Sequence, residues 1–163
     1  MALFDLTRIY GKPYTVDQGS SPGVPIATSP LESTEKPSRS TVAQCYEAIE
    51  KDLTDAINSN ALPKTNEVGY VNLWAAKALQ VRVYMTKGEW SKALSVAEDI
   101  ISNSSYKLWE PSEYVAAWSK SDANHSKEIM FEISINNNTD WTDREGIAYL
   151  YADKAGASPG YGD

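Results

Sequence analysis

The chain of 163 residues has one cysteine, one histidine and few basic residues. The single cysteine, Cys45, excludes a disulfide within the chain, and one cysteine with one histidine cannot form a zinc cluster. No stretch approaches the ~20 apolar residues that a helix needs to span a bilayer. Because 22 acidic residues outnumber 15 basic ones, the chain also lacks the basic stripe of a nucleic-acid-binding surface. We therefore expect no metal, no other cofactor and no nucleic-acid partner.

What is present is an ordinary globular composition with strong helical patterns. Residues 72–86 are apolar over most of the circumference of a helix, and Asn72 is a suitable N-cap. A second helical pattern follows the turn at Gly88, with apolar residues at i, i+3, i+4, i+7, i+10 and i+11. These are Trp90, Ala93, Leu94, Ala97, Ile100 and Ile101. Two antiparallel helices joined in this way form a tetratricopeptide-type hairpin.

A second hairpin is interrupted by a long loop. Residues 2–11 and 41–59 have helical patterns, and Thr41 with Gln44 has the spacing of a capping box. Between them, residues 11–39 are rich in Gly, Pro, Ser and Thr, which predicts a loop insertion in place of a tight turn.

Two details of this part are also predicted. Residues 23–26 are among the few apolar anchors of the loop and can fold back onto the core. Cys45 lies within the helical pattern, so it is predicted to be a small buried residue.

The rest of the chain is less regular. We predict an extended piece at 106–108, a short helix at 111–118 with Pro111 in its first turn, and a strand at 128–135. A polar loop follows at 136–143, and 144–153 is either a short helix or irregular. The predicted fold is thus mostly α-helical, with helical hairpins over 2–103, the loop insertion at 11–39 and an irregular segment with a short strand over 104–163, all within one domain of 1–163.

Five motifs follow one another along residues 2 to about 135. They are Ala2-Leu3-Phe4-Asp5-Leu6-Thr7-Arg8-Ile9-Tyr10-Gly11-Lys12-Pro13-Tyr14, Gly23-Val24-Pro25-Ile26, Ser38-Arg39-Ser40-Thr41-Val42 leading to Ile49-Glu50-Lys51-Asp52-Leu53, Ala75-Ala76-Lys77-Ala78-Leu79-Gln80-Val81-Arg82-Val83-Tyr84, and Lys127-Glu128-Ile129-Met130-Phe131-Glu132-Ile133. No single motif is specific, but in this order and spacing they closely resemble the SusD/RagB family.

The resemblance implies a surface-exposed outer-membrane lipoprotein of Bacteroidetes-type bacteria. Such a protein works with a TonB-dependent transporter and captures glycans or other nutrients for import. Its fold is mostly α-helical, with tetratricopeptide-type helices beside an irregular region that shapes the ligand site. The chain begins inside a helical pattern and lacks the lipoprotein signal, so we expect an internal fragment of a longer protein. Cys45 lies mid-helix and is not the lipid anchor.

Aromatic side chains are the natural candidates for stacking against sugar rings. Helical spacing predicts that most of them belong to the core, and Trp109 and Trp118 are expected to pack under loops. Trp141 differs because it follows three asparagines and is flanked by acidic residues. The candidate ligand-binding residues are therefore Trp141, Asp140, Asn137 and Tyr149. Those assigned to the core are Trp74, Tyr84, Trp90, Tyr46 and Tyr10.

No catalytic constellation is evident. Glu128 and Glu132 would stand ~13 Å apart along a strand, too far for a glycosidase pair. Asp140 and Asp143 are expected to be solvated in a loop, and no nucleophile elbow or phosphate loop occurs. We predict a non-enzymatic glycan- or nutrient-binding subunit of an outer-membrane uptake complex. The alternative is a tetratricopeptide-type scaffold that binds a peptide or protein partner.

Overall fold

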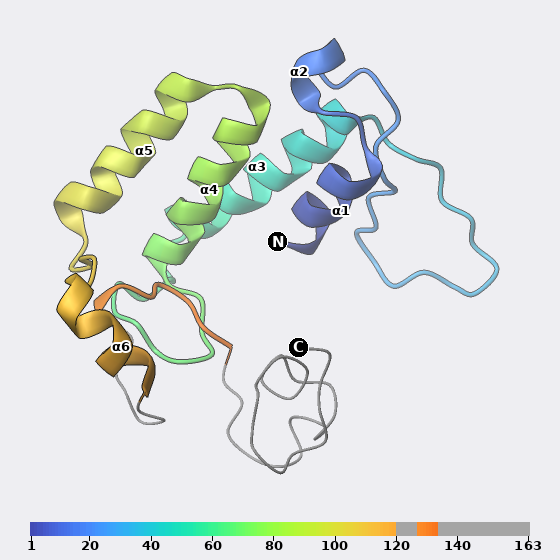
Figure 1. Ribbon diagram of the computed structural model, residues 1–163. Helices are drawn as coiled ribbons and strands as arrows, with labels where there is room; N and C mark the ends of the chain where they lie inside the picture. Colours follow the sequence, from blue (N-terminus) through green and yellow to red (C-terminus); the bar gives the residue numbers. More distant parts are fainter. Residues whose placement is uncertain (120–126, 134–163) are drawn as a thin grey trace, which may run out of the picture. The chain divides into compact units, whose positions relative to one another are not determined.

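The computed structural model describes residues 1–119 and 127–133 (Figure 1). The chain divides into two compact units, Met1–Phe131 and Glu132–Asp163. The described residues contain six helices, all in the first unit, and no strand. The helices are α1 (Ala2–Tyr10), α2 (Tyr14–Asp17), α3 (Val42–Asn58), α4 (Leu73–Lys87), α5 (Trp90–Asn103) and α6 (Pro111–Ser119). The predicted mostly α-helical fold is confirmed.

Helices α4 and α5 form the predicted hairpin (Figure 1). The side chain of Asn72 accepts hydrogen bonds from the backbone N–H groups of Trp74 and Ala75, both at 3.0 Å, which caps α4. The helix ends at Gly88, whose φ of 78° is the left-handed conformation that glycine adopts without strain. Because α4 also contacts α2 and α3, its apolar circumference has neighbours on several sides, as the sequence indicated.

The split hairpin is formed by α1 and α3, which pack against each other. The core of the unit combines these two helices with α4. Phe4 and Tyr46 meet edge to face with ring centroids 6.2 Å apart. The buried residues of this cluster are Phe4, Val42, Tyr46, Ile49 and Val83.

The loop between α1 and α3 is bonded to the start of α3. The N–H groups of Val42 and Ala43 donate to the carbonyls of Ser21 and Gly19, at 2.9 and 2.8 Å. Thr41 and Gln44 form the predicted capping box. The first N–H groups of α3, which have no partner within a helix, are thus all satisfied.

Two further contacts hold the same loop. Val24 is buried, and the Sγ of the buried Cys45 donates to its carbonyl at 3.4 Å. The guanidinium of Arg39 donates to the carbonyls of Gly23, Pro22 and Tyr10. The predicted folding back of residues 23–26 is therefore confirmed at Val24, and so is the burial of Cys45.

Lys87, at the end of α4, joins several elements. Its ammonium group pairs with Glu50 of α3 and with Glu89, and it lies 5.2 Å from the ring centroid of Tyr14. Burial disfavours the charge of Lys87, but the hydrogen bonds with the two carboxylates outweigh burial and raise its pKa. The side chain therefore remains charged although little of it is exposed.

Two residues that were predicted to be in the core are exposed. Tyr10 is 65% exposed and Trp90 is 64% exposed. Tyr10 is the last residue of α1, beyond the buried Phe4 and Thr7. On α5 only α4 packs closely among the described helices, so it covers the centre of the apolar stripe at Ala93 and leaves the flank at Trp90 open. A stripe wider than one neighbouring helix cannot be buried by that helix alone. Trp74 and Tyr46 are buried as predicted, and Tyr84 is half-buried.

The predicted strand is also wrong over its described part, residues 128–133. A strand needs a partner ladder, but the described backbone bond in this region lies just before the segment, from Lys107 N–H to the carbonyl of Lys127 at 2.7 Å. Asparagine side chains take two of its carbonyls instead. The amide of Asn66 donates to Ile129, and that of Asn72 donates to Met130. The expected ~13 Å separation of Glu128 and Glu132 assumed a strand and therefore no longer applies.

No helix in the described part of the chain is both long and apolar enough to cross a membrane.

Candidate functional site

The predicted ligand-binding residues Trp141, Asp140, Asn137 and Tyr149 lie outside the described residues. Their assignment stays a prediction. Within the described residues, two features could bind another molecule. They are an apolar pocket between α3 and α4 and a group of aromatic rings at α6.

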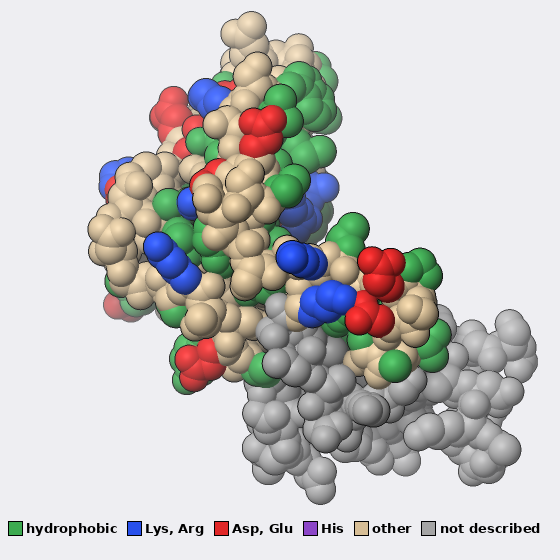
Figure 2. All heavy atoms as spheres, turned by 90° about the vertical axis from the view of Figure 1, so that its left-hand side faces the viewer, with side chains coloured by type: hydrophobic (Ala, Val, Ile, Leu, Met, Phe, Trp, Pro, Cys, Tyr) green, Lys and Arg blue, Asp and Glu red, His purple; other side chains and the backbone are tan. Residues whose placement is uncertain are grey.

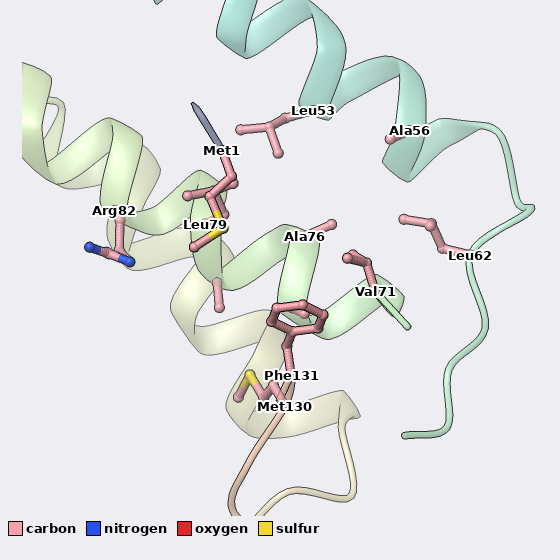
Figure 3. A pocket seen from close by; sticks show the side chains of 12 residues that line it. Met1, Leu53, Ala56, Leu62, Val71, Ala76, Leu79, Arg82, Met130 and Phe131 are labelled. Carbon is pink, nitrogen blue, oxygen red and sulfur yellow. The ribbon is translucent and has the colours of Figure 1, made fainter. Parts of the chain in front are cut away.

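The pocket has a volume of about 410 Å³. Its walls come from α3, α4 and the segment at Met130 and Phe131, as Figure 3 shows. The alanines that α4 contributes to the lining, Ala75, Ala76 and Ala78, are too small to fill the space between the helices, and the pocket remains open there. The lining residues are Met1, Leu53, Ala56, Leu62, Val71, Ala75, Ala76, Ala78, Leu79, Arg82, Met130 and Phe131.

This pocket suits an apolar occupant. Arg82 is its only charged lining residue and lies at one edge in Figure 3. A sugar placed there would leave most of its hydroxyl groups without hydrogen-bond partners, and an unpaired buried hydroxyl costs roughly 1–3 kcal/mol in proteins. Its described lining also includes no carboxylate, histidine, cysteine or hydroxyl side chain. It is therefore a place for apolar side chains to pack.

The second feature is a ring cluster formed by Trp109, Tyr114 and Trp118. The ring centroids of Trp109 lie 6.0 Å from Tyr114 and 5.7 Å from Trp118, and the two rings on α6 are 6.3 Å apart. The interplanar angles are 75°, 78° and 63°, so each pair meets edge to face, the arrangement that aromatic quadrupoles favour. Trp118 is 52% exposed and Tyr114 is 53% exposed. The three rings therefore contact one another, and the two on α6 are about half exposed.

Local bonds fix the position of these rings. Glu128 accepts a hydrogen bond from the backbone N–H of Trp109 at 2.7 Å. Glu113 accepts one from the backbone N–H of Glu110 at 2.9 Å, which satisfies a free donor at the start of α6, and it also pairs with Lys127. Its hydrogen bond with the Lys127 ammonium holds the pKa of the Glu113 carboxyl below its usual value. The Glu113 carboxylate, next to Tyr114 in the sequence, therefore stays ionised at neutral pH.

Asn72 connects this region to the helical core. Its fully buried amide donates to the Tyr106 hydroxyl at 3.0 Å and to the Met130 carbonyl at 2.8 Å, while its oxygen caps α4. Burial raises the pKa of Tyr106, although the hydrogen bond from Asn72 opposes this shift. The Asn72 side chain therefore joins the two parts of the irregular segment, at Tyr106 and at Met130, to the start of α4.

The ring cluster was not predicted from the sequence. Trp109 and Trp118 were expected to pack under loops, and Tyr114 was not considered. Tyr114 and Trp118 are four residues apart in the helix that was predicted, so they had to share one side of it. That spacing was the available signal. The approach of Trp109, which precedes the helix, carried no such signal.

Comparison with known proteins identifies the fold. A SusD-like family profile described as "Starch-binding associating with outer membrane" matches residues 1–85. A SusD superfamily protein of Bacteroides thetaiotaomicron is 46% identical, with a TM-score of 0.73, over 83% of this chain and 29% of that one. The chain belongs to the SusD-like family. The resemblance noted from the motifs is therefore confirmed.

Two further solved structures match the chain. A protein of Bacteroides vulgatus, named as a candidate sugar-binding protein, is 44% identical over 93% of this chain and 34% of that one, with a TM-score of 0.81. A SusD superfamily protein of the same organism is 36% identical over 83% of this chain and 31% of that one, with a TM-score of 0.70. The chain spans about a third of the length of these relatives. No match to a curated protein was found.

Proposed function

We propose that this SusD-like chain belongs to a glycan-binding subunit of an outer-membrane uptake complex, which captures oligosaccharide without cleaving it. The observation that carries the proposal is the match of residues 1–85 to a family described as starch-binding and associated with the outer membrane. The B. vulgatus relative, named as a candidate sugar-binding protein, supports the same ligand class. By family analogy the subunit is a surface-exposed lipoprotein beside a TonB-dependent transporter.

The described side chains suit capture better than cleavage. A glycosidase needs two carboxyl groups that flank the bond to be broken, one of them free to carry a proton. Glu128 instead accepts the Trp109 N–H, and Glu113 is paired with Lys127. Both carboxylates therefore have structural roles.

A glycan-array screen of the full-length native protein tests this proposal. We expect binding to at least one class of oligosaccharide, with no release of reducing ends from that oligosaccharide. Trp141→Ala should weaken the binding if the predicted loop site is correct. The control must be an exposed tryptophan, and Trp74 is unsuitable because it is buried. Trp90→Ala is a better control, since Trp90 is an exposed tryptophan on the helical hairpin.

The alternative function, a scaffold that binds a peptide, draws on the apolar pocket between α3 and α4. An extended or helical peptide could place an apolar side chain there. The scaffold would be favoured if the protein bound no glycan on the array and instead bound a peptide, and if Leu79→Glu abolished the peptide binding. Binding of glycan that Leu79→Glu leaves unchanged would favour capture.

A further inference from the structure

The exposed side of α5 has the pattern of a surface that packs against another helix. We propose that the face formed by Trp90, Leu94, Ala97 and Ile101, called here the α5 seam, packs against a helix from the part of the full-length protein that lies outside this chain. The α5 seam shares no residue with the apolar pocket or with the ring cluster. It is therefore a separate surface, and its role goes beyond the proposed glycan binding.

The first argument is the spacing of these side chains along α5. They follow one another at intervals of four, three and four residues, the repeat of the residues that interlock between two paired helices. The α5 seam extends over about 16 Å of the helix. Ala97, near its centre, is small enough for a second helix to come close. The α5 seam therefore has the form of a contact surface for one more helix.

The second argument is exposure. Trp90, Leu94 and Ile101 are 64, 60 and 78% exposed, whereas Ala93 and Ile100, on the neighbouring side of α5, are buried. Helix α4 packs closely against α5. Helix α5 lies at the left of Figure 1, the side that faces the viewer in Figure 2, where hydrophobic side chains reach the surface among charged ones. One apolar side of α5 is thus covered, and the next is open.

Helix α3 shows how this protein builds a side that faces solvent. Its exposed positions are polar or charged, as at Glu47 and Thr54, and none of its large apolar side chains is exposed. On α5 the exposed positions that border the α5 seam are instead mostly serines, Ser91, Ser95 and Ser102. Serine is small and uncharged, so a second helix can approach between these residues. The two helices therefore differ in what their outer sides suit.

The third argument is the placement of charge on α5. Because a helix turns about 100° per residue, Lys92 and Asp99 lie on the flank away from the α5 seam. Lys92 lies 2.7 Å from a carboxylate oxygen of Glu89, and Asp99 pairs with Lys77 of α4. A covering helix would meet Glu98 at the border of the α5 seam and no other charged side chain of α5. It would therefore bury no unpaired charge, which would be costly.

Size and family decide which helix this is. A standard interface between two molecules uses about 20–30 residues on each side, far more than the α5 seam offers to a second copy. A helix of the same chain needs a smaller surface, because the covalent connection keeps its local concentration high. The chain covers 29–34% of three solved relatives, so a full-length protein of similar size has most of its residues outside it.

The kind of fold favours the same occupant. Hairpins of the tetratricopeptide type bury their apolar sides by stacking on one another, and a hairpin that ends a stack has a polar outer side. The α5 seam is apolar. The hairpin of α4 and α5 is therefore built as an internal member of a stack, and the helix on the α5 seam belongs to another hairpin of the same protein.

The test measures access to the α5 seam in the full-length native protein. Leu94→Cys and Ile101→Cys place a thiol in it, and Thr54→Cys places one on the polar side of α3 as a matched control. Cys45 is fully buried and adds little background. We expect a water-soluble maleimide to label the two α5 thiols at least about tenfold more slowly than Thr54→Cys in the folded protein, and at the same rate in urea.

Three outcomes of this labelling would overturn the proposal. The first is equal labelling of the α5 thiols and the control in the folded protein. The second is protection that disappears on dilution, which would identify a second copy as the occupant. The third is protection that is found only in isolated outer membranes and not in the purified protein, which would identify another protein.

Thermal unfolding gives a second measurement. Trp90→Ala should lower the midpoint of the full-length protein by roughly 2 °C or more, because it removes a large side chain from a packed contact. Glu47→Ala, on the exposed side of α3, should leave the midpoint unchanged. Below its midpoint Trp90→Ala remains folded and can still serve as the glycan-binding control. Equal midpoints for Trp90→Ala and the native protein would overturn the proposal and leave glycan binding untouched.

Discussion

Two parts of the first unit, the loop over residues 11–41 and the segment described at 104–119 and 127–131, are held in different ways. The loop lies against α3 through backbone bonds at Gly19 and Ser21, and Arg39 joins the two ends of the loop to each other and to Tyr10 of α1. The segment is attached mainly through side chains, with Asn72 as the central link. The loop thus completes the helical core, whereas the segment is joined to it at few points and carries exposed rings.

The difference suggests a division of roles. The carbonyls of the loop satisfy the N–H groups at the start of α3, so loosening the loop would expose the end of a core helix. The described bonds of the segment to the core run mainly through the side chains of Asn66 and Asn72. Irregular backbone is therefore held by its own hydrogen bonds in one place and by single side chains of the core in another.

The largest expected effect comes from Asn72, where both arms of the segment meet the core. Asn72→Ala removes the cap of α4 and the bonds to Tyr106 and Met130, so we expect a loss of roughly 3 kcal/mol of unfolding free energy. Urea denaturation followed by circular dichroism measures it.

Asn72→Ser separates the two roles of this residue. Serine can still cap α4 but cannot reach Tyr106 and Met130. We expect it to recover about 1 kcal/mol of the loss, while amide hydrogen exchange increases at residues 127–133. Native stability in the serine variant would show that the bonds to the segment contribute nothing.

The next effect lies in the loop, at Gly19. Its φ is 76°, and a Cβ there would come within 2.7 Å of the Ala43 backbone nitrogen. Gly19→Ala should therefore cost roughly 2–3 kcal/mol, because it adds a clash with rigid backbone to the strain of a left-handed alanine. Thermal unfolding would show a lower midpoint.

Gly88→Ala is the matched control for this substitution. Its φ is 78°, but the added Cβ would meet only the Thr15 methyl at 3.2 Å. We expect a smaller loss of about 1 kcal/mol. Equal losses at the two glycines would mean that the loop yields at Gly19, and that it is less firmly attached to α3 than its hydrogen bonds indicate.

Arg39 offers a milder way to loosen the same loop. Arg39→Ala removes the donors to Gly23, Pro22 and Tyr10, and since the site is partly exposed we expect a loss of about 1–2 kcal/mol. Proteinase K should then cut residues 25–37 faster. Arg39→Lys keeps the charge but not the planar fork of donors, so it should restore little. Full rescue by lysine would show that charge alone holds the loop.

Features that depend on local sequence could be predicted, and those that depend on distant partners could not. The caps at Thr41 and Asn72 and the turn at Gly88 involve residues within a few positions, and all three were predicted. The bonds of Arg39 to Tyr10 and Gly23 join residues 29 and 16 positions apart, and no local pattern announces them.

The errors have the same origin. The segment at 128–133 has apolar residues for both faces of a strand, but only the fold decides whether a partner strand is present. The apolar stripe of α5 was correctly located, yet its burial depends on how many helices cover it, so Trp90 was misplaced. For the ring cluster, the spacing of Tyr114 and Trp118 could have been read from the sequence, while the approach of Trp109 required the structure.

The smallest expected effect compares one carboxylate from each irregular part. The hydroxyl of Ser21 lowers the pKa of Asp17 in the loop, and the ammonium of Lys127 lowers that of Glu113 in the segment. A carboxyl whose pKa is lower in the folded state stabilises the fold above its unfolded pKa, and this contribution disappears as the pH falls through the lowered value. Both parts should therefore loosen in the acidic range, below the ordinary values of 3.8 and 4.5.

Salt distinguishes the two carboxylates. In about 1 M NaCl the screening length is about 3 Å, so the exposed pair of Glu113 and Lys127 should weaken and the pKa of Glu113 should return toward its ordinary value. The pKa of Asp17 should stay low, because its main partner is an uncharged hydroxyl. NMR titration of the carboxyl carbons at low and high salt measures both, with Lys127→Met and Ser21→Ala as controls. An equal response of the two groups to salt would mean that the segment is held by the same kind of contact as the loop, and the contrast between them would then rest on Asn72 and Arg39 alone.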